Sequence, residues 1–284
     1  MSVLNPSTPA FEPWARYPVP QWSSENVIKN VWKTNFKEEI LKISHLLEKY
    51  SYVAMDTEFP GIIVRAQGDV RDPQYQTIRS NVDRLKLIQV GITLSDTNGN
   101  FPPDTSTWQF NLKFDLKIDT YSEDSIQLLK SSGIDFDVHL REGIEAMEFA
   151  ELFTVSGLVL NEDITYITFH SGYDFAYLLK SLTCQKLPES QNGFYQLLKT
   201  YFPVFYDLKH IVRGIDQYRG GLNRIAEELG IKRIGRTHQG GSDSLVTLEA
   251  FFKLKNEYFA GDSLEEHLNV ICGLTDASQE YNSM

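Results

Sequence analysis

The sequence predicts an α/β fold in which helices flank a mixed β-sheet within a single domain. Three strand candidates come first, at Tyr52–Phe59, Leu85–Leu94 and Thr107–Phe114, and helices alternate with strands after them. The 284 residues, 42 % of them hydrophobic, suffice for one large core without cross-links. The two cysteines, Cys184 and Cys272, exclude a disulfide-rich fold and favour a reducing compartment.

Hydrophobic periodicity predicts the remaining elements. Apolar residues at helical spacing predict a helix within Val27–Lys49, ahead of the first strand. β-branched and aromatic residues predict two later strands, at Ile164–His170 and Val204–Tyr206. The other helices are expected at 123–132, 142–155, Asp174–Leu182, Gly221–Leu229 and Asp243–Tyr258.

The two ends of the chain differ from the domain itself, which we expect to span residues 26–272. Five of the eleven prolines lie in the first 20 residues, so residues 1–25 are predicted to form an extended arm. The aromatic residues between these prolines leave two roles open, packing on the domain or docking on a partner. Residues 273–284 are expected to form a polar tail.

The net charge of −11, from 27 basic and 38 acidic residues, limits the possible partners. Such a chain repels phosphate backbones at long range, so a protein that coats DNA or RNA is disfavoured. A nucleic-acid enzyme with acidic metal ligands remains compatible, because bound divalent cations reverse the local field. The chain contains no apolar run of the roughly 20 residues that a membrane helix needs, and no secretory signal is expected.

Two acidic residues, Asp56 and Glu58, lie at the end of the first predicted strand. Side chains at positions i and i+2 of a strand point to the same face, so these carboxylates lie side by side in an otherwise apolar segment. Unpaired, they would repel each other, whereas a divalent cation would use their oxygens as ligands. The spacing alone is a weak signal, because Asp135 and Asp137 repeat it in a less apolar context.

Two further segments place polar residues where a helix begins. Asp174 follows the strand that ends at His170, and ligands of α/β folds gather where strands end. Alternatively, Asp174 complements the helix dipole and His170 is a core or turn residue. Asp243 begins a helix after two glycines, either as a metal ligand or as its cap. His238, five residues earlier, is either a base that takes a proton from the attacking water or a surface residue.

Together these segments resemble the DEDD superfamily of 3′→5′ exonucleases, in the subtype whose histidine lies five residues before the last Asp. A narrower resemblance is to the CAF-one/Pop-two family, the catalytic deadenylase subunits of the CCR–NOT complex. It covers about residues 27 to 260 and rests on five segments: YVAMDTEFPG, STWQFNLKF, FHSGYDFAYLLK, FPVFYDLKH and HQGGSDSLVTLEAFFK. The resemblance implies an RNase H-like fold, with a mixed sheet flanked by helices.

The resemblance also implies the chemistry, a two-metal hydrolysis that shortens mRNA poly(A) tails and releases 5′-AMP. The cations would be Mg²⁺, with Mn²⁺ able to substitute, because both suit oxygen ligands. His238 would be the general base, and Phe59 would either meet the terminal nucleotide or belong to the core. Four carboxylates would hold the metals: those of Asp56, Glu58, Asp174 and Asp243.

By the same resemblance, the partners are the mRNA poly(A) tail, the MIF4G-like domain of the NOT scaffold, the leucine-rich repeats of a second deadenylase, and antiproliferative adaptor proteins. We expect the cytoplasm and the nucleus as locations, and no membrane. Because the chain is acidic, affinity for mRNA is expected to come mainly from partners. Two alternatives stay open, an interaction module with dispensable catalysis and a nuclease acting on DNA or structured RNA. A serine hydrolase is set aside, because the Gly240–Ser244 segment lacks the Gly-x-Ser-x-Gly elbow.

Overall fold

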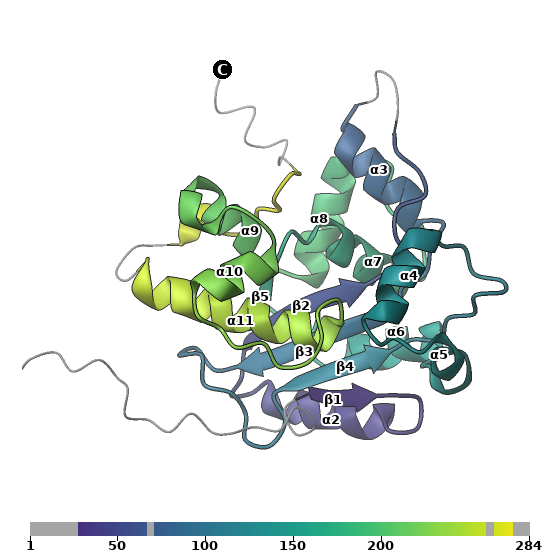
Figure 1. Cartoon of the computed structure of the whole chain (residues 1–284), viewed down its shortest axis with the longest axis horizontal. Coiled ribbons are helices and arrows are strands. Elements are labelled where there is room, and N and C mark those ends of the chain that lie inside the picture. The colour runs from purple at the N-terminus through teal and green to yellow at the C-terminus, as the bar shows by residue number, and fades with distance from the viewer. Residues whose placement is uncertain (1–27, 67–70, 260–263, 275–284) are drawn as a thin grey trace, which may run out of the picture.

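The structure is a computed structural model, and it describes residues 28–66, 71–259 and 264–274 (Figure 1). Its six strands are β1 (Ile28–Val31), β2 (Tyr52–Glu58), β3 (Gln89–Ser95), β4 (Thr107–Asn111), β5 (Thr165–Thr168) and β6 (Val204–Asp207). They form one sheet in the order β1-β4-β3-β2-β5-β6. β3 is antiparallel to β2 and β4, whereas β1 pairs in parallel with β4, and β2, β5 and β6 are parallel. The predicted mixed sheet is confirmed.

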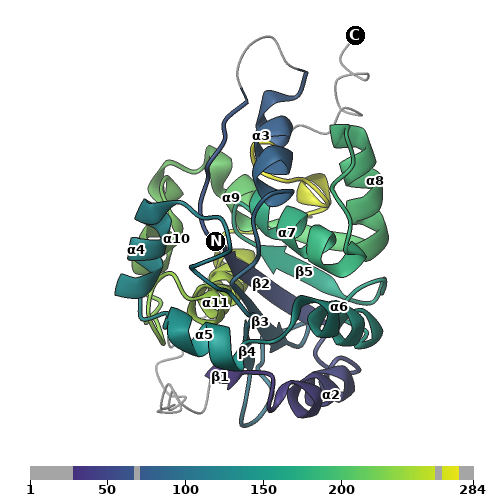
Figure 2. The ribbon, with the colours of Figure 1, turned by 90° about the vertical axis from the view of Figure 1, so that its right-hand side faces the viewer.

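Helices cover both faces of this sheet. They are α2 (Phe36–Leu46), α3 (Pro73–Val82), α4 (Glu123–Ser131), α5 (Phe136–Glu142), α6 (Ala146–Val155), α7 (Gly172–Thr183), α8 (Gln191–Tyr201), α9 (Leu208–Ile211), α10 (Leu222–Glu228) and α11 (Gly240–Glu257). Figure 2 shows α10 and α11 on one side of the sheet, and α6 and α7 on the other. Each helix of the described residues is too short or too polar to cross a bilayer.

Two hydrophobic clusters hold these layers together. The larger cluster lies between the sheet and α2, α6, α7 and α8, and Phe110, Phe149 and Phe175 in it are completely buried. The smaller cluster lies under α11, where Leu248 and Phe251 pack with residues of the sheet. The sheet is therefore covered on both faces, which leaves the ends of its strands as the place where polar side chains can gather.

The first predicted helix is wrong over its initial residues. Ile28–Val31 is an edge strand, because it pairs with residues 107–110 of β4 in a register that no local pattern reveals. Asn35 then forms the turn into α2, since its side chain accepts a hydrogen bond from the Trp32 N–H and donates one to the Asn30 carbonyl. The apolar spacing begins to be helical only at Phe36.

The helices expected from the sequence do not include α3, α5, α8 or the four-residue α9. α5 begins at a helix cap, because the Asp135 carboxylate accepts the N–H groups of Asp137 and Val138. In the second acid-x-acid pair, Asp135 and Asp137, the first acid therefore serves as a helix cap. Leu274, two residues after the expected end of the domain, is buried. The predicted arm (residues 1–25) and the rest of the tail lie outside the described residues.

Candidate active site

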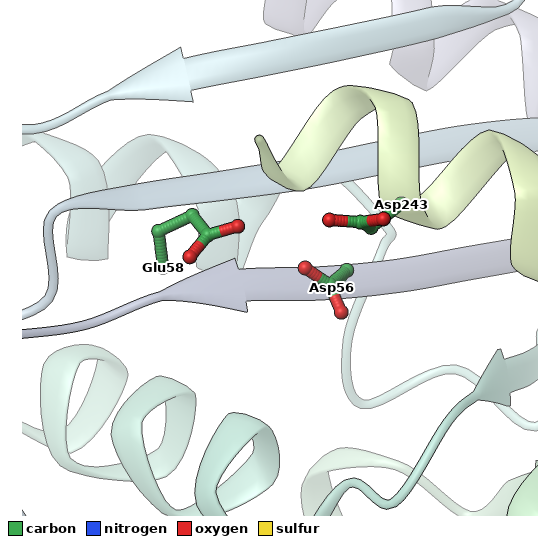
Figure 3. A group of neighbouring side chains, drawn as sticks. All are labelled: Asp56, Glu58 and Asp243. Carbon is green, nitrogen blue, oxygen red and sulfur yellow. The ribbon is translucent and has the colours of Figure 1, made fainter. Parts of the chain in front are cut away.

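Asp56 and Glu58 leave β2 on the face that α11 covers. The alternation of side chains along the strand explains this, because Ala54 packs in the cluster under α11 whereas Val53 and Met55 belong to the opposite cluster. Figure 3 shows both carboxylates beside that of Asp243, which comes from α11. One oxygen from each of these three residues lies within 4.8 Å of the other two. A single cation could therefore contact all three.

Two glycines let α11 approach the sheet closely enough for this. A Cβ atom at Gly91 of β3 would lie 1.9 Å from the carbonyl carbon and oxygen of Gly240, the first residue of α11. Gly91 pairs with Asp56 of β2, so this contact sits beside the predicted metal ligands. A side chain at position 91 would push the helix away from the strand that carries Asp56.

Two glutamines complete the attachment of the helix. The Oε1 atom of Gln89 accepts a hydrogen bond from the Gly240 N–H at 2.8 Å, and that of Gln109 accepts one from the Gly241 N–H at 3.0 Å. Both amides are among the free donors at the start of a helix, so the sheet itself supplies the cap. The first turn of α11, with Asp243 in it, is thereby fixed over the sheet.

Asp243 is a ligand candidate rather than a helix cap. α11 begins three residues earlier, and the carboxylate of Asp243 bonds outside the helix. Its Oδ1 atom lies 2.6 Å from Nη1 of Arg233, and its Oδ2 atom accepts the backbone N–H of His238 at 2.9 Å. His238 has a φ of 59° and an exposed side chain, so it lies at the rim of the site.

Asp174 lies in the first turn of α7 and is held by β2. Its Oδ1 atom accepts hydrogen bonds from the backbone N–H and the hydroxyl of Thr57. Asp174 is not part of the three-carboxylate group. Its negative charge nevertheless raises the pKa of both Asp56 and Glu58, so it is an immediate neighbour of that group.

The electrostatics of the four carboxylates favour a bound cation. Burial raises the pKa of Asp56 well above its usual value, the charges of the three neighbouring carboxylates raise it further, and Arg233 partly offsets them. Burial and the charges of Asp243 and Asp174 likewise raise the pKa of Glu58. Burial raises the pKa of Asp174 to about 6 against the hydrogen bonds from Thr57, which lower it. Divalent cations fit this all-oxygen donor set, since they relieve the repulsion.

Phe59 stacks on two tyrosines of α7. Its ring centroid lies 5.1 Å from that of Tyr173 and 4.9 Å from that of Tyr177, with interplanar angles of 22° and 24°. Phe59 is only partly buried and packs against the larger cluster. The geometry supports the core role, and the contact with a terminal nucleotide stays a prediction.

His170 is a turn residue, and its backbone N–H is bonded to a buried acid, Asp207, that was not predicted from the sequence. Its φ is 57°, and its backbone N–H donates to Oδ1 of Asp207, as does the N–H of Lys209. Asp207 is completely buried at the end of β6, and its charge raises the pKa of Asp174. One sequence feature could have indicated Asp207: it directly follows the predicted strand Val204–Tyr206. No such feature indicated Thr57 or Arg233, because their contacts depend on the tertiary fold.

Known proteins share this sequence over most of its length. A family model described as CAF1 family ribonuclease matches residues 31–153. The poly(A) ribonuclease pop2 of Schizosaccharomyces pombe is 50 % identical over 250 residues, which cover 87 % of this chain and 75 % of that protein. The chain belongs to the CAF1 ribonuclease family. This confirms the family that the five sequence segments indicated.

Solved structures of the CAF1 family share the fold as well. S. pombe Pop2p in its Mg²⁺- and Mn²⁺-bound form matches with a TM-score of 0.84 and 50 % identity, over 87 % of this chain and 99 % of that one. Yeast CAF1 co-crystallised with the NOT1 MIF4G domain matches with a TM-score of 0.76 and 34 % identity, over 90 % and 99 %. The predicted RNase H-like fold is thus confirmed.

Proposed function

We propose that this chain is a poly(A)-specific 3′→5′ exoribonuclease that shortens mRNA tails and releases 5′-AMP. The observation that carries the proposal is the carboxylate group of Asp56, Glu58 and Asp243, with Asp174 beside it, in a member of a ribonuclease family. The name of the S. pombe relative, a poly(A) ribonuclease, supports the substrate. The form in which Pop2p was solved supports Mg²⁺ and Mn²⁺ as cofactors.

Two divalent cations in this site would activate the attacking water and stabilise the leaving 3′ oxygen. Asp56 would contact both, because it belongs to the three-carboxylate group and is also affected by the charge of Asp174, which raises its pKa. Glu58 and Asp243 would complete one metal site, and Asp174 would serve the other. The four side chains come from β2, α7 and α11, so the fold must form before the metals can bind.

His238 would accept the proton of the attacking water. Its exposed ring extends from a loop whose backbone is tied to a metal ligand, because the His238 N–H donates to Asp243. A histidine suits this role because it exchanges protons near neutral pH.

We infer that the chain acts within the CCR–NOT complex, in the cytoplasm and the nucleus. The 34 % identical yeast CAF1, co-crystallised with the NOT1 MIF4G domain, supports the NOT scaffold as a partner. The leucine-rich repeats of a second deadenylase and antiproliferative adaptors complete the proposed set. The net charge of −11 supports a division of labour in which partners supply most of the affinity for RNA.

The decisive experiment removes the central carboxylate. We expect the purified chain with Mg²⁺ to shorten a 3′-oligoadenylate tail, and the Asp56→Ala variant to lose this activity by about a thousandfold or more, because both metals lose a ligand. Asp137→Ala, which removes an exposed acid of the second acid-x-acid pair, is the matched control and should keep full activity. Equal cleavage of oligo(U), oligo(C) or oligo(dA) would contradict poly(A) specificity.

A second function, a structural link within the complex, is favoured by the co-crystal of yeast CAF1 with the scaffold domain. The Asp56→Ala variant separates the two functions, because the carboxylate is inside the site and should not affect scaffold binding. If the Asp56→Ala variant restores tail shortening in cells as well as the parent does, catalysis by this chain is dispensable.

A further inference from the structure

The guanidinium group of Arg233 lies directly against the carboxylate site. Its Nη1 atom is 2.6 Å from Oδ1 of Asp243 and donates to Oγ of Ser242 at 2.8 Å. Its Nη2 atom donates to Oδ1 of Asn223, near the start of α10, at 2.6 Å. The side chain is only 16 % exposed, and it lies in the segment between α10 and α11. The two arms of the guanidinium therefore fasten α10 to the first turn of α11.

The other oxygen of Asp243 extends this chain of contacts to His238. Oδ2 accepts the His238 N–H, and His238 has a φ of 59°. A residue other than glycine is strained in this left-handed region, and it persists only where its surroundings hold it. The contacts run from Arg233 through Asp243 to the backbone of His238, so the orientation of the histidine depends on the orientation of the carboxylate.

We propose that Arg233 is a positioning residue, whose forked guanidinium fixes the Asp243 carboxylate for metal binding and, through it, the backbone of His238. The part of this inference that concerns His238 rests on the proposed function. The part that concerns Asp243 rests on the metal site alone.

The proposed effect of Arg233 lies in its geometry, because its charge has two opposed effects: it lowers the pKa of Asp56, which favours the ionised ligand, and it repels the metal. A positive charge beside a cation site repels the incoming metal. The planar guanidinium, by contrast, is held by Asn223 through its other arm, so the arm that contacts Asp243 fixes the carboxylate oxygen in direction as well as in distance. Partners that orient a metal-ligating carboxylate are worth about 10- to 100-fold in metal affinity or activity. Loss of the fork should therefore weaken metal binding even though a repulsive charge is removed.

Calorimetric titration of the metal-free chain with Mn²⁺ tests the first part. We expect Arg233→Met and Arg233→Lys to bind Mn²⁺ about 10- to 100-fold more weakly than the parent. Arg236→Met is the matched control, because Arg236 is an exposed arginine of the same segment, and it should bind Mn²⁺ as the parent does. If Arg233→Lys binds Mn²⁺ with the affinity of the parent, a positive charge at this position suffices. If Arg233→Met binds Mn²⁺ more tightly than the parent, Arg233 competes with the metal for Asp243. Either result overturns the proposal.

Asn223→Ala keeps the test valid if the Arg233 variants fail to fold. This change leaves Arg233 and Asp243 in place and removes only the acceptor of the second arm, at an exposed position. The variant should bind Mn²⁺ more weakly than the parent, but by a smaller factor than Arg233→Lys. Parent-like Mn²⁺ affinity in a folded Asn223→Ala protein would contradict the proposed positioning role of Arg233.

Steady-state kinetics at saturating Mn²⁺ test the second part. With the metals in place, Arg233→Lys should still show kcat about tenfold lower than the parent on a short oligoadenylate. Its KM should be unchanged, because the loss is in positioning the base rather than in binding RNA. Parent-like kcat at saturating metal would overturn the link to His238. Because the Mn²⁺ titration contains no RNA, failure of the parent to cleave poly(A) would refute the proposed function while leaving the metal test intact.

Discussion

Thr57 donates two hydrogen bonds to the same oxygen of Asp174, from its backbone N at 2.9 Å and from its hydroxyl at 2.6 Å. Thr57 is the residue between Asp56 and Glu58, and the pleat of β2 points it to the opposite face. One strand thus supplies two carboxylates directly and positions a third through the residue between them. The middle position of the acid-x-acid motif is therefore part of the site.

Replacing Thr57 by Val tests this relationship. The variant keeps the shape of the side chain and the backbone hydrogen bond, but it removes the hydroxyl that holds Asp174. We expect kcat for oligoadenylate in Mg²⁺ to fall about tenfold, because the partner of a metal-ligating carboxylate is lost. Thr57→Ser, which keeps the hydroxyl, should remain within about twofold of the parent. Equal kcat values for Thr57→Val and Thr57→Ser would show that the Thr57 hydroxyl does not contribute to the site.

The raised pKa values predict how the stability of the metal-free chain depends on pH. Asp56, Glu58 and Asp174 all have raised folded-state pKa values, to about 6 for Asp174, so the folded chain binds their protons more tightly than the unfolded chain does. Their stabilising contribution is complete below about pH 4 and is lost as the pH rises through the folded pKa values. In EDTA, the parent should therefore lose stability between about pH 5 and pH 8.

The Asp56→Asn variant supplies the comparison for this prediction. It removes one of the repelling charges, so its melting temperature in EDTA should fall less steeply with pH and should exceed that of the parent near pH 8. Saturating Mn²⁺ should reverse the order, because a ligand at 100 times its Kd stabilises the parent by about 2.7 kcal/mol. Thermal unfolding followed by circular dichroism measures this. Parallel pH curves for the two proteins would contradict the electrostatic account.

Close packing of α11 on the sheet predicts that Gly91→Ala is severely destabilising. The added Cβ would lie 1.9 Å from backbone atoms of Gly240, which cannot move without displacing Asp243. We expect a loss of about 3 kcal/mol or more in the free energy of unfolding, and no Mn²⁺ binding. Gly214→Ala is the control, because no atom of the described residues other than its own chain neighbours lies within 4 Å of the added Cβ. A Gly91→Ala protein as stable as Gly214→Ala would contradict the packing.

The proposed base predicts a difference in pH dependence. At saturating Mg²⁺, the rate of the parent should fall as the pH decreases, because a protonated histidine cannot accept the proton of the attacking water. The His238→Ala variant should be slower by about 10²- to 10⁴-fold and should lack that limb of the profile. Rate measurements between about pH 5 and pH 8 in both proteins decide the point. Identical slopes would exclude His238 as the base.

Local patterns predicted those parts of the site that depend on one element. The period of two along β2 predicted that Asp56 and Glu58 share a face, and the start of a helix after a strand made Asp174 a candidate. Nothing local brings residues 56 and 243 together, and only the resemblance to a family joined them. Arg233 and β1 escaped prediction because a salt bridge and a parallel strand pairing are made between distant segments.

Crystals soaked in Mn²⁺ and measured for anomalous scattering test the central claim most directly. The account predicts two peaks, one among Asp56, Glu58 and Asp243 and the other between Asp56 and Asp174. Peaks elsewhere in the molecule, or none among these four carboxylates at saturating Mn²⁺, would contradict it.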